Sequence, residues 1–244
     1  MKSEWLNAED AAKYVGISMS NLYSMAQANT IPAHRVGKVW RFSVHELDTW
    51  IRVSKPTNEF FTSVDFNIDE NLYLREPQRD AYFAAYDFFS GGGKKAIIQL
   101  PVGCGKSGLI SILPFGIARG RVLVIAPNLT IKKELVNALD VTNKRFCFWH
   151  KCNILKPEVM TAGPYLAVLD SQNANIHDCE QSHFVLTNIQ QLAGNTDRWL
   201  SQFTEDYFDM VLVDEGHHSA AVSWVNVFQK FHNAKIINLT TLFL

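Results

Sequence analysis

Residues 96–107 read Ala-Ile-Ile-Gln-Leu-Pro-Val-Gly-Cys-Gly-Lys-Ser. The first five residues are typical of a buried strand, and Gly103 and Gly105 then form a turn that ends in Lys106-Ser107. Small residues let the backbone amides of such a turn curl around an anion, while the lysine supplies a cation and the serine a metal ligand. The strict phosphate-loop pattern has one more glycine, at the position of Leu100.

A second segment, residues 210–218, reads Met-Val-Leu-Val-Asp-Glu-Gly-His-His. It is an apolar strand with two carboxylates at its end, so Asp214 is expected to hold magnesium and Glu215 to act as general base for water. Adjacent histidines point apart and do not easily share one metal ion, so we expect His217 to couple nucleotide to nucleic acid. Together the two segments predict nucleotide hydrolysis. Lys106 would bridge the β- and γ-phosphates, and Ser107 would join Asp214 at the magnesium ion.

Composition is that of an ordinary globular protein. The 244 residues are 47% hydrophobic and 19% charged, with a formal net charge of −1, so any surface for nucleic acid must be local. The start of the chain lacks a signal-peptide pattern, and no apolar stretch approaches the roughly 20 residues that span a bilayer. We therefore expect a cytoplasmic protein without a membrane partner, whose cysteines (Cys104, Cys147, Cys152 and Cys179) are reduced thiols.

Helical patterns alternate with short apolar segments from about residue 72 onward. This alternation is typical of a parallel sheet covered by helices, so we predict an α/β fold with a small separate unit before it. The expected strands are 96–100, 121–126, 166–169, 183–187, 209–213 and 235–239, and the expected helices are 77–89, 106–118, 129–139, 188–200 and 219–231. Residues 54–58 indicate the start of a linker, and residues 60–66 are compatible with a short strand.

The small unit has the pattern of a helix-turn-helix. Asn7 is placed to cap a first helix, and Gly16-Ile17-Ser18 breaks it before a second one. Two short extended segments about Gly37-Lys38 then suggest a hairpin, and Ser43-Val44-His45-Glu46 is a capping-box pattern that opens a third helix.

This stretch resembles the excisionase-type, MerR-like winged helix-turn-helix family. The shared pattern includes Ala11-Ala12, Leu22-Tyr23, Pro32, Trp40-Arg41 and Trp50-Ile51. The resemblance implies binding to duplex DNA, with Ser20, Asn21 and Tyr23 at base edges and Arg35, Lys38 and Arg41 at phosphates. The second helix contains no Lys or Arg, so weak affinity is expected, and a protein-docking module is the alternative.

The large unit resembles the first RecA-like domain of superfamily 2 helicases of the Asp-Glu-x-His type, with a P-loop NTPase fold. Within this superfamily, the sequence most resembles the helicase subunits of type I and type III restriction enzymes. Residues 74–81, 122–129 and 184–192 match further family segments, in the family's order. The resemblance implies ATP and Mg²⁺ as cofactors, loops that touch the DNA strand backbone, and a nucleotide site that includes Arg75, Gln78 (reading adenine), Gly103, Cys104, Gly105, Lys106 and Ser107.

After Ile236-Ile237-Asn238-Leu239-Thr240 the family continues into a second RecA-like domain, whereas this sequence reads Thr241-Leu242-Phe243-Leu244. In the family that second domain supplies an arginine to the reaction. We therefore expect two units, at 1–53 and 72–244, joined by a linker at 54–71. The chain is expected to bind nucleotide and to hydrolyse it slowly. We also expect a truncated gene product, with a partner protein that supplies the second domain. The alternatives are a non-catalytic DNA-binding regulator and a nucleotide-gated adaptor.

Residues 149–182 show no clear period. Cys147, His150, Cys152, His177, Cys179 and His183 invite a zinc hypothesis, but their spacing matches no common structural site. Cys147 alternates with Phe146 and Phe148 as a core strand residue would, and the aromatic cluster with Trp149 favours core over base stacking.

Overall fold

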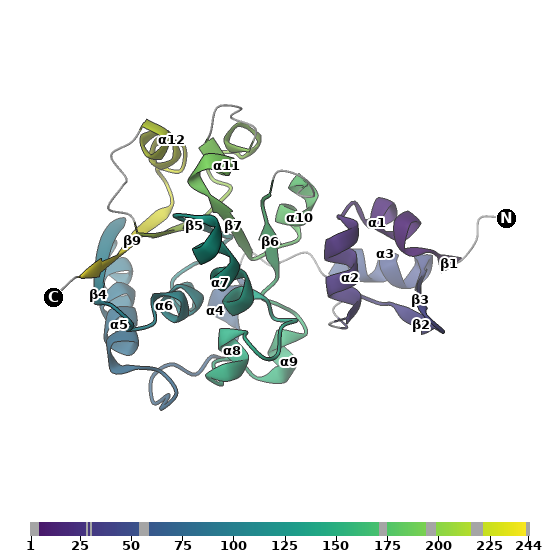
Figure 1. The fold of residues 1–244 in the computed structure, drawn as a ribbon, viewed down its shortest axis with the longest axis horizontal. Helices are drawn as coiled ribbons and strands as arrows, with labels where there is room; N and C mark the ends of the chain where they lie inside the picture. The colour runs from purple at the N-terminus through teal and green to yellow at the C-terminus, as the bar shows by residue number, and fades with distance from the viewer. Residues whose placement is uncertain are drawn as a thin grey trace.

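The computed structural model describes residues 5–27, 29, 31–53, 59–170, 175–193, 199–215 and 222–242. Figure 1 shows a small N-terminal unit at one end of a larger α/β unit. Their cores are separate, because the buried side chains of the small unit form a cluster of their own. No helix among the described residues is long and apolar enough to cross a membrane.

The small unit is a helix-turn-helix followed by a hairpin and a third helix. Asn7 caps the first helix by accepting a hydrogen bond from the backbone N–H of Asp10, and Gly16 ends it in the left-handed region, at φ 81°. Ser18 caps the second helix by accepting from the backbone N–H of Asn21 (3.2 Å). The helices are α1 (Ala8–Val15), α2 (Met19–Gln27) and α3 (Val44–Val53).

The expected hairpin is present as β2 (His34–Val36) and β3 (Val39–Ser43), which pair antiparallel across Gly37-Lys38. A short strand that the sequence did not predict, β1 (Trp5–Leu6), pairs with the other side of β3. The core of this unit joins α2, β3 and α3, each of which contributes a fully buried side chain: Leu22, Phe42 and Leu47.

Six strands from the described part of the chain form a parallel sheet in the order β4-β9-β8-β5-β7-β6. Every residue of β5, β7 and β8 is buried, which is why these segments read as continuous apolar runs. The expected α/β class and parallel sheet are confirmed. The strands are β4 (Lys95–Pro101), β5 (Val122–Ala126), β6 (Leu166–Val168), β7 (Phe184–Asn188), β8 (Met210–Asp214) and β9 (Lys235–Leu242).

Helices cover both faces of this sheet (Figure 1). Alternate residues of one strand belong to different cores: Val122 and Val124 of β5 pack in one cluster, while Leu123 and Ile125 pack in the other. The helices are α5 (Glu76–Ser90), α6 (Lys106–Ile112), α7 (Leu129–Leu139), α8 (Phe148–Lys151), α9 (Pro157–Met160), α10 (Ile176–Glu180), α11 (Ile189–Ala193), a 3₁₀ turn (Leu200–Gln202) and α12 (Val222–Lys230).

Residues 60–66 do not form the expected strand. They begin with a short helix, α4 (Phe60–Ser63), in which two consecutive side chains, Phe60 and Phe61, are both buried. A strand would have turned one of them outward. Phe61 packs edge-on against Phe115 and Phe184, so burial in the large unit overrides the local alternation.

Two expected helices differ in length. The helix expected over 106–118 ends at Ile112, because Pro114 has no N–H to continue the ladder and Gly116 adopts φ 72°. The helix expected over 188–200 is α11 followed by a 3₁₀ turn, with residues 194–198 outside the described chain. Residues 219–221 of the last expected helix also lie outside it, as do residues 54–58 of the expected linker, 54–71. The rest of that segment is not a free linker, because Phe60, Phe61 and Ile68 pack in the core of the large unit.

Candidate functional site

The two segments that carry the expected chemistry end at the same edge of the sheet. β9 lies between β4 and β8 and pairs parallel with both. In this register Leu100 of β4 is opposite Thr241, and Asp214 of β8 is opposite Leu239. Parallel strands present their carboxyl ends together, so the turn after β4 meets the acidic end of β8.

Lys106 is the centre of this meeting point. Its ammonium group contacts the carboxylate of Glu215 and the hydroxyl of Thr241, and it lies 3.8 Å from Oδ1 of Asp214. The Thr241 hydroxyl also donates to Glu215. Thr241 is not among the site residues expected from the sequence, and the only signal for it was its position just after the expected strand 235–239.

The charged groups of this cluster are poorly solvated. Asp214 is 2% exposed; burial raises the pKa of its carboxyl group, and the nearby Lys106 ammonium opposes that rise only in part. Burial likewise lowers the pKa of Lys106, against the influence of Asp214. Burial of the site therefore disfavours the charged forms of both groups, and ligands of opposite charge would relieve that cost.

The donor set fits a magnesium ion. Oδ1 of Asp214 is buried and has no hydrogen-bond partner among the described residues, so a hard carboxylate oxygen is left to accept a cation. Ser107 lies in the first turn of α6, half-buried. Magnesium typically takes one or two protein ligands and fills its octahedron with water and phosphate oxygens, which matches this sparse set.

The turn before Lys106 is braced from α5. Arg75 donates from its guanidinium to the carbonyl of Gly103, and Gln78 donates from Nε2 to the carbonyl of Gly105 (2.7 Å). Oε1 of Gln78 accepts from the backbone N–H of Arg75 (3.0 Å), so both ends of this buried amide are engaged. The structure thus shows Arg75 and Gln78 holding the turn, while their contact with a nucleotide stays a prediction.

Glycine is required within this turn. Gly103 and Gly105 have φ of 79° and 84°, which β-carbon-bearing residues rarely adopt. A Cβ at Gly105 would also lie 2.6 Å from Nε2 of Gln78. Between them, Cys104 is half-buried and its backbone N–H donates to the carbonyl of Pro101 (3.2 Å).

Glu215 stands in a strained backbone position, with φ 54°. Such conformations cost about 1–3 kcal/mol in non-glycine residues and concentrate at functional sites, so the strain agrees with a catalytic role. His217, the coupling residue expected from the sequence, lies in residues 216–221 and therefore outside the described chain.

The loops expected to touch a nucleic-acid strand follow β5 and β7, which are neighbours of each other, and β5 also pairs with β8. Asn128 begins α7 by accepting from the N–H of Ile131, and Asn188 at the end of β7 accepts from the N–H of Gln191. Both loops therefore share the sheet edge with Asp214.

The expected DNA-contacting residues of the small unit divide into two groups. Arg35, Lys38 and Arg41 are exposed on the hairpin, with the guanidinium of Arg35 5.8 Å from the centre of the Trp40 ring. On α2, Ser20 and Tyr23 are exposed, whereas Asn21 is half-buried.

The cysteines and histidines of the 147–183 region do not gather. All six candidate ligands are among the described residues. In that part of the chain, no three His, Cys, Asp or Glu side chains are placed to hold a metal ion. Cys147 precedes a helix instead of lying in a strand, and burial raises its thiol pKa to about 11. Trp149 is core, donating from Nε1 to the carbonyl of Ser111 (2.8 Å), although Phe146 is exposed.

Two family models match the chain. The model described as the type III restriction enzyme res subunit matches residues 71–243. The chain belongs to the res-subunit family. This membership confirms the resemblance to superfamily 2 helicases of restriction systems. A model described as a helix-turn-helix domain matches residues 5–52 and confirms the fold of the small unit.

Two solved structures to which the chain is similar are named as helicases. The UvsW helicase from bacteriophage T4 is 16% identical over 82% of this chain and 60% of that one, with a TM-score of 0.46. The Hef helicase domain of Pyrococcus furiosus is 16% identical over 68% and 32%, with a TM-score of 0.48. The chain thus spans less than two thirds of the length of these proteins. A search of curated protein sequences gave no match.

Proposed function

We propose that this chain binds ATP with magnesium and hydrolyses it when DNA is bound, as the nucleotide-binding half of a helicase-type motor. The observation that carries the proposal is the convergence of Lys106, Asp214 and Glu215 at the carboxyl ends of β4 and β8. A cation for phosphate, a buried oxygen for a metal ion and a second carboxylate for water are the groups that phosphoryl transfer to water needs.

Each side chain then has a distinct part. Lys106 leaves Glu215 and pairs with the phosphates, while the backbone amides of the Gly103–Gly105 turn surround them. Ser107 and Oδ1 of Asp214, which has no hydrogen-bond partner among the described residues, would hold magnesium, and the ion would offset phosphate charge. Glu215, released from Lys106, accepts a proton from the attacking water.

DNA enters the proposal at two places. Arg35, Lys38 and Arg41 form an exposed cationic hairpin that suits duplex phosphates, beside a helix that suits base edges. The loops after β5 and β7 share the sheet edge with the nucleotide site, so a strand bound there can influence Glu215. A second RecA-like domain, from a partner protein or another part of the same protein, would supply the transition-state arginine, typically worth about 10³–10⁵ in rate.

Binding and turnover test the proposal separately. A fluorescent ATP analogue is titrated into wild type and Lys106→Ala with and without magnesium, and phosphate release is measured with no DNA, single-stranded DNA and duplex. We expect magnesium-dependent binding that Lys106→Ala abolishes, and slow turnover that DNA raises. Wild type that binds no nucleotide would overturn the enzymatic function and leave a DNA-binding regulator or adaptor.

A further inference from the structure

The first turn of α2 is docked on the large unit. Oδ1 of Asp178 in α10 accepts hydrogen bonds from the backbone N–H of Ser18 (3.0 Å) and from Nδ2 of Asn21 (3.3 Å). Beside it, Nδ2 of Asn175 donates to the carbonyl of Gly16 (3.2 Å). Asp178 is only 7% exposed, so the contact removes its carboxylate from water.

This is the end of α2 that would meet DNA. In a helix-turn-helix the N-terminal residues of the second helix contact base edges, and the free N–H groups and dipole of a helix start favour an anion. Asp178 supplies an anion from the same chain. Asn21, one of the three side chains assigned to base edges, uses its amide nitrogen on this carboxylate.

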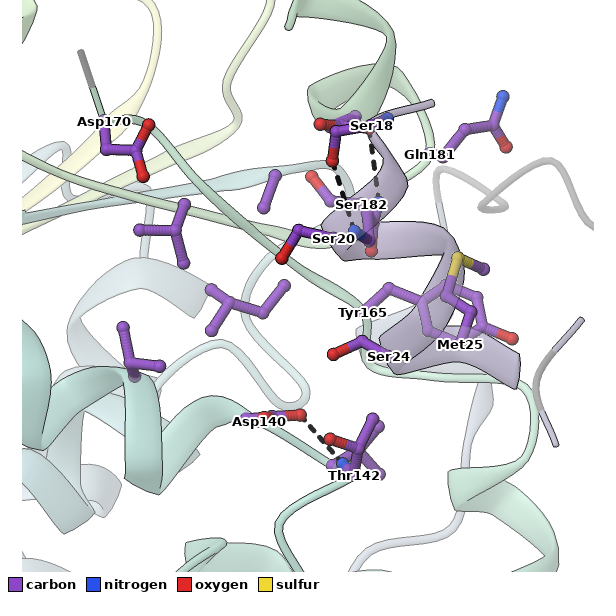
Figure 2. Close-up of a pocket in the computed structure, with 17 residues that line it drawn as sticks. Ser18, Ser20, Ser24, Met25, Asp140, Thr142, Tyr165, Asp170, Gln181 and Ser182 are labelled. Atoms are coloured by element: carbon purple, nitrogen blue, oxygen red, sulfur yellow. Dashed lines mark hydrogen bonds between the residues drawn. The ribbon is translucent and has the colours of Figure 1, made fainter. Parts of the chain in front are cut away.

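A cavity beside the contact has three aspartates and no cation in its lining. This cavity, of about 250 Å³, lies between the two units, and Figure 2 shows Ser20 and Ser24 of α2 across from Asp140. Asp170 and Asp178 line the same cavity, so every charged side chain in its lining is a carboxylate. Residues 19–27 contain no charged side chain, which lets α2 lie against this wall without an unpaired cation.

We propose that Asp178 is an autoinhibitory latch for the helix-turn-helix unit. Asp178 and DNA compete for the first turn of α2, so the docked chain cannot read bases with Asn21. Arg35, Lys38 and Arg41 stay exposed in the docked state and can still touch phosphates. This proposal rests on the proposed DNA binding of the helix-turn-helix unit. It implies that α2 can recognise DNA bases only after the unit has separated from the large unit.

Two substitutions in the full-length chain test the latch. Asp178→Ala removes the acceptor of both hydrogen bonds. Glu180→Ala is the matched control, because Glu180 lies on the same helix and its carboxylate contacts Nδ1 of His177 (3.0 Å), a residue of that helix. Asn175→Asp keeps the cap of α10 but replaces the donor to Gly16 with a carboxylate, so it releases the unit by a second route. Thermal melting establishes that each variant is folded.

The readouts are hydrogen exchange of the α2 amides and affinity for a random-sequence duplex pool. We expect Asp178→Ala and Asn175→Asp to exchange faster in α2 and to bind duplex about 10-fold more tightly, since the binding-competent fraction rises, with Glu180→Ala like wild type. Unchanged exchange and affinity in both variants overturn the latch. Faster exchange without duplex binding by any variant supports the docking contact and contradicts DNA binding by the unit.

Discussion

The ammonium group of Lys106 contacts the carboxylate of Glu215, a residue 109 positions further along the chain. The contact joins the phosphate-binding lysine to the expected general base. While it lasts, Lys106 is held away from a phosphate and Glu215 away from a water molecule. Nucleotide binding must break this ion pair, so the same two residues set both the affinity for ATP and the rate of its hydrolysis.

Glu215→Gln is expected to separate those two quantities. The variant lacks the charge that holds Lys106, so it should bind ATP more tightly than wild type. It also lacks the base, so turnover should fall by about 10²–10⁴. Analogue binding and single-turnover hydrolysis measure the two effects, and Glu158→Gln, at an exposed carboxylate on α9, is the control. Weaker binding by Glu215→Gln would show that the ion pair supports the site instead of blocking it.

Asp214→Asn is expected to stabilise the nucleotide-free protein while removing magnesium dependence. The raised pKa of the Asp214 carboxyl means that the folded state holds its proton more tightly than the unfolded state. Its stabilising contribution is present at low pH and is lost as pH rises through the folded pKa. At neutral pH the substitution should therefore add roughly 0.5–2 kcal/mol to the free energy of unfolding.

The matched control for that variant is Asp209→Asn, just before the other end of β8. Asp209 pairs with Lys235 (3.0 Å) and accepts from the backbone N–H of Arg119 (2.8 Å), so its loss should lower stability. Denaturant unfolding of both variants decides the matter. If Asp214→Asn lowers the free energy of unfolding instead, the interactions of the Asp214 carboxylate stabilise the fold by more than its burial costs.

Gly105→Ala is expected to damage the phosphate turn more than Gly103→Ala. Both positions have φ near 80°, so both substitutions carry a similar backbone strain, about 1–2 kcal/mol. Only at Gly105 would the new Cβ meet Nε2 of Gln78, at 2.6 Å, whereas nothing lies within 4 Å of a Cβ at Gly103. Equal losses of stability and of nucleotide affinity in the two variants would contradict a bracing role for Gln78.

His183 is expected to make the fold sensitive to acid. Burial, with a smaller effect from Arg121, lowers the pKa of its imidazole from 6.5 to about 3, while Nδ1 accepts from the backbone N–H of Tyr165 (3.0 Å). The unfolded chain takes up a proton below pH 6.5 and the folded chain does not, so stability falls as pH drops from 6.5 toward 3. The loss should reach roughly 3 kcal/mol by pH 4.

His183→Gln keeps an acceptor for Tyr165 without a titrating group, so its free energy of unfolding should fall less between pH 7 and pH 4. His232→Gln, at an exposed histidine, is the control and should follow wild type. Urea unfolding at several pH values measures both. An unchanged acid dependence in His183→Gln would place the acid-sensitive group elsewhere.

Arg35→Ala combined with Arg41→Ala is expected to weaken duplex binding and flatten its salt dependence. Each lost phosphate contact should reduce the slope of log affinity against log salt by about 1, so the double variant should lose about 2. Lys13→Ala, which removes an exposed cation paired with Glu9 on α1, is the control. A slope equal to that of wild type would favour protein docking as the role of this hairpin.

Much of the fold could be predicted because its signals are local. Apolar runs located every strand of the parallel sheet to within a few residues, and Asn7 and Gly16 marked the ends of α1. The errors at 60–66 and 106–118 arose where distant packing or a proline overrode the pattern, as Phe61 against Phe115 shows. Residues 149–182 had no clear period because their described part consists of short helices and one three-residue strand, β6, each too short to show one.

The sequence alone determined the chemistry that is available: a glycine turn ending in Lys106-Ser107, and carboxylates at 214 and 215 after a buried strand. Only the tertiary structure decided which of these groups meet. The order β4-β9-β8 brings Thr241 to Lys106, and the docking of α2 brings Asn21 to Asp178, 157 residues away. Such pairings depend on strand order and on the fit of two separate cores, and no local periodicity encodes either of them.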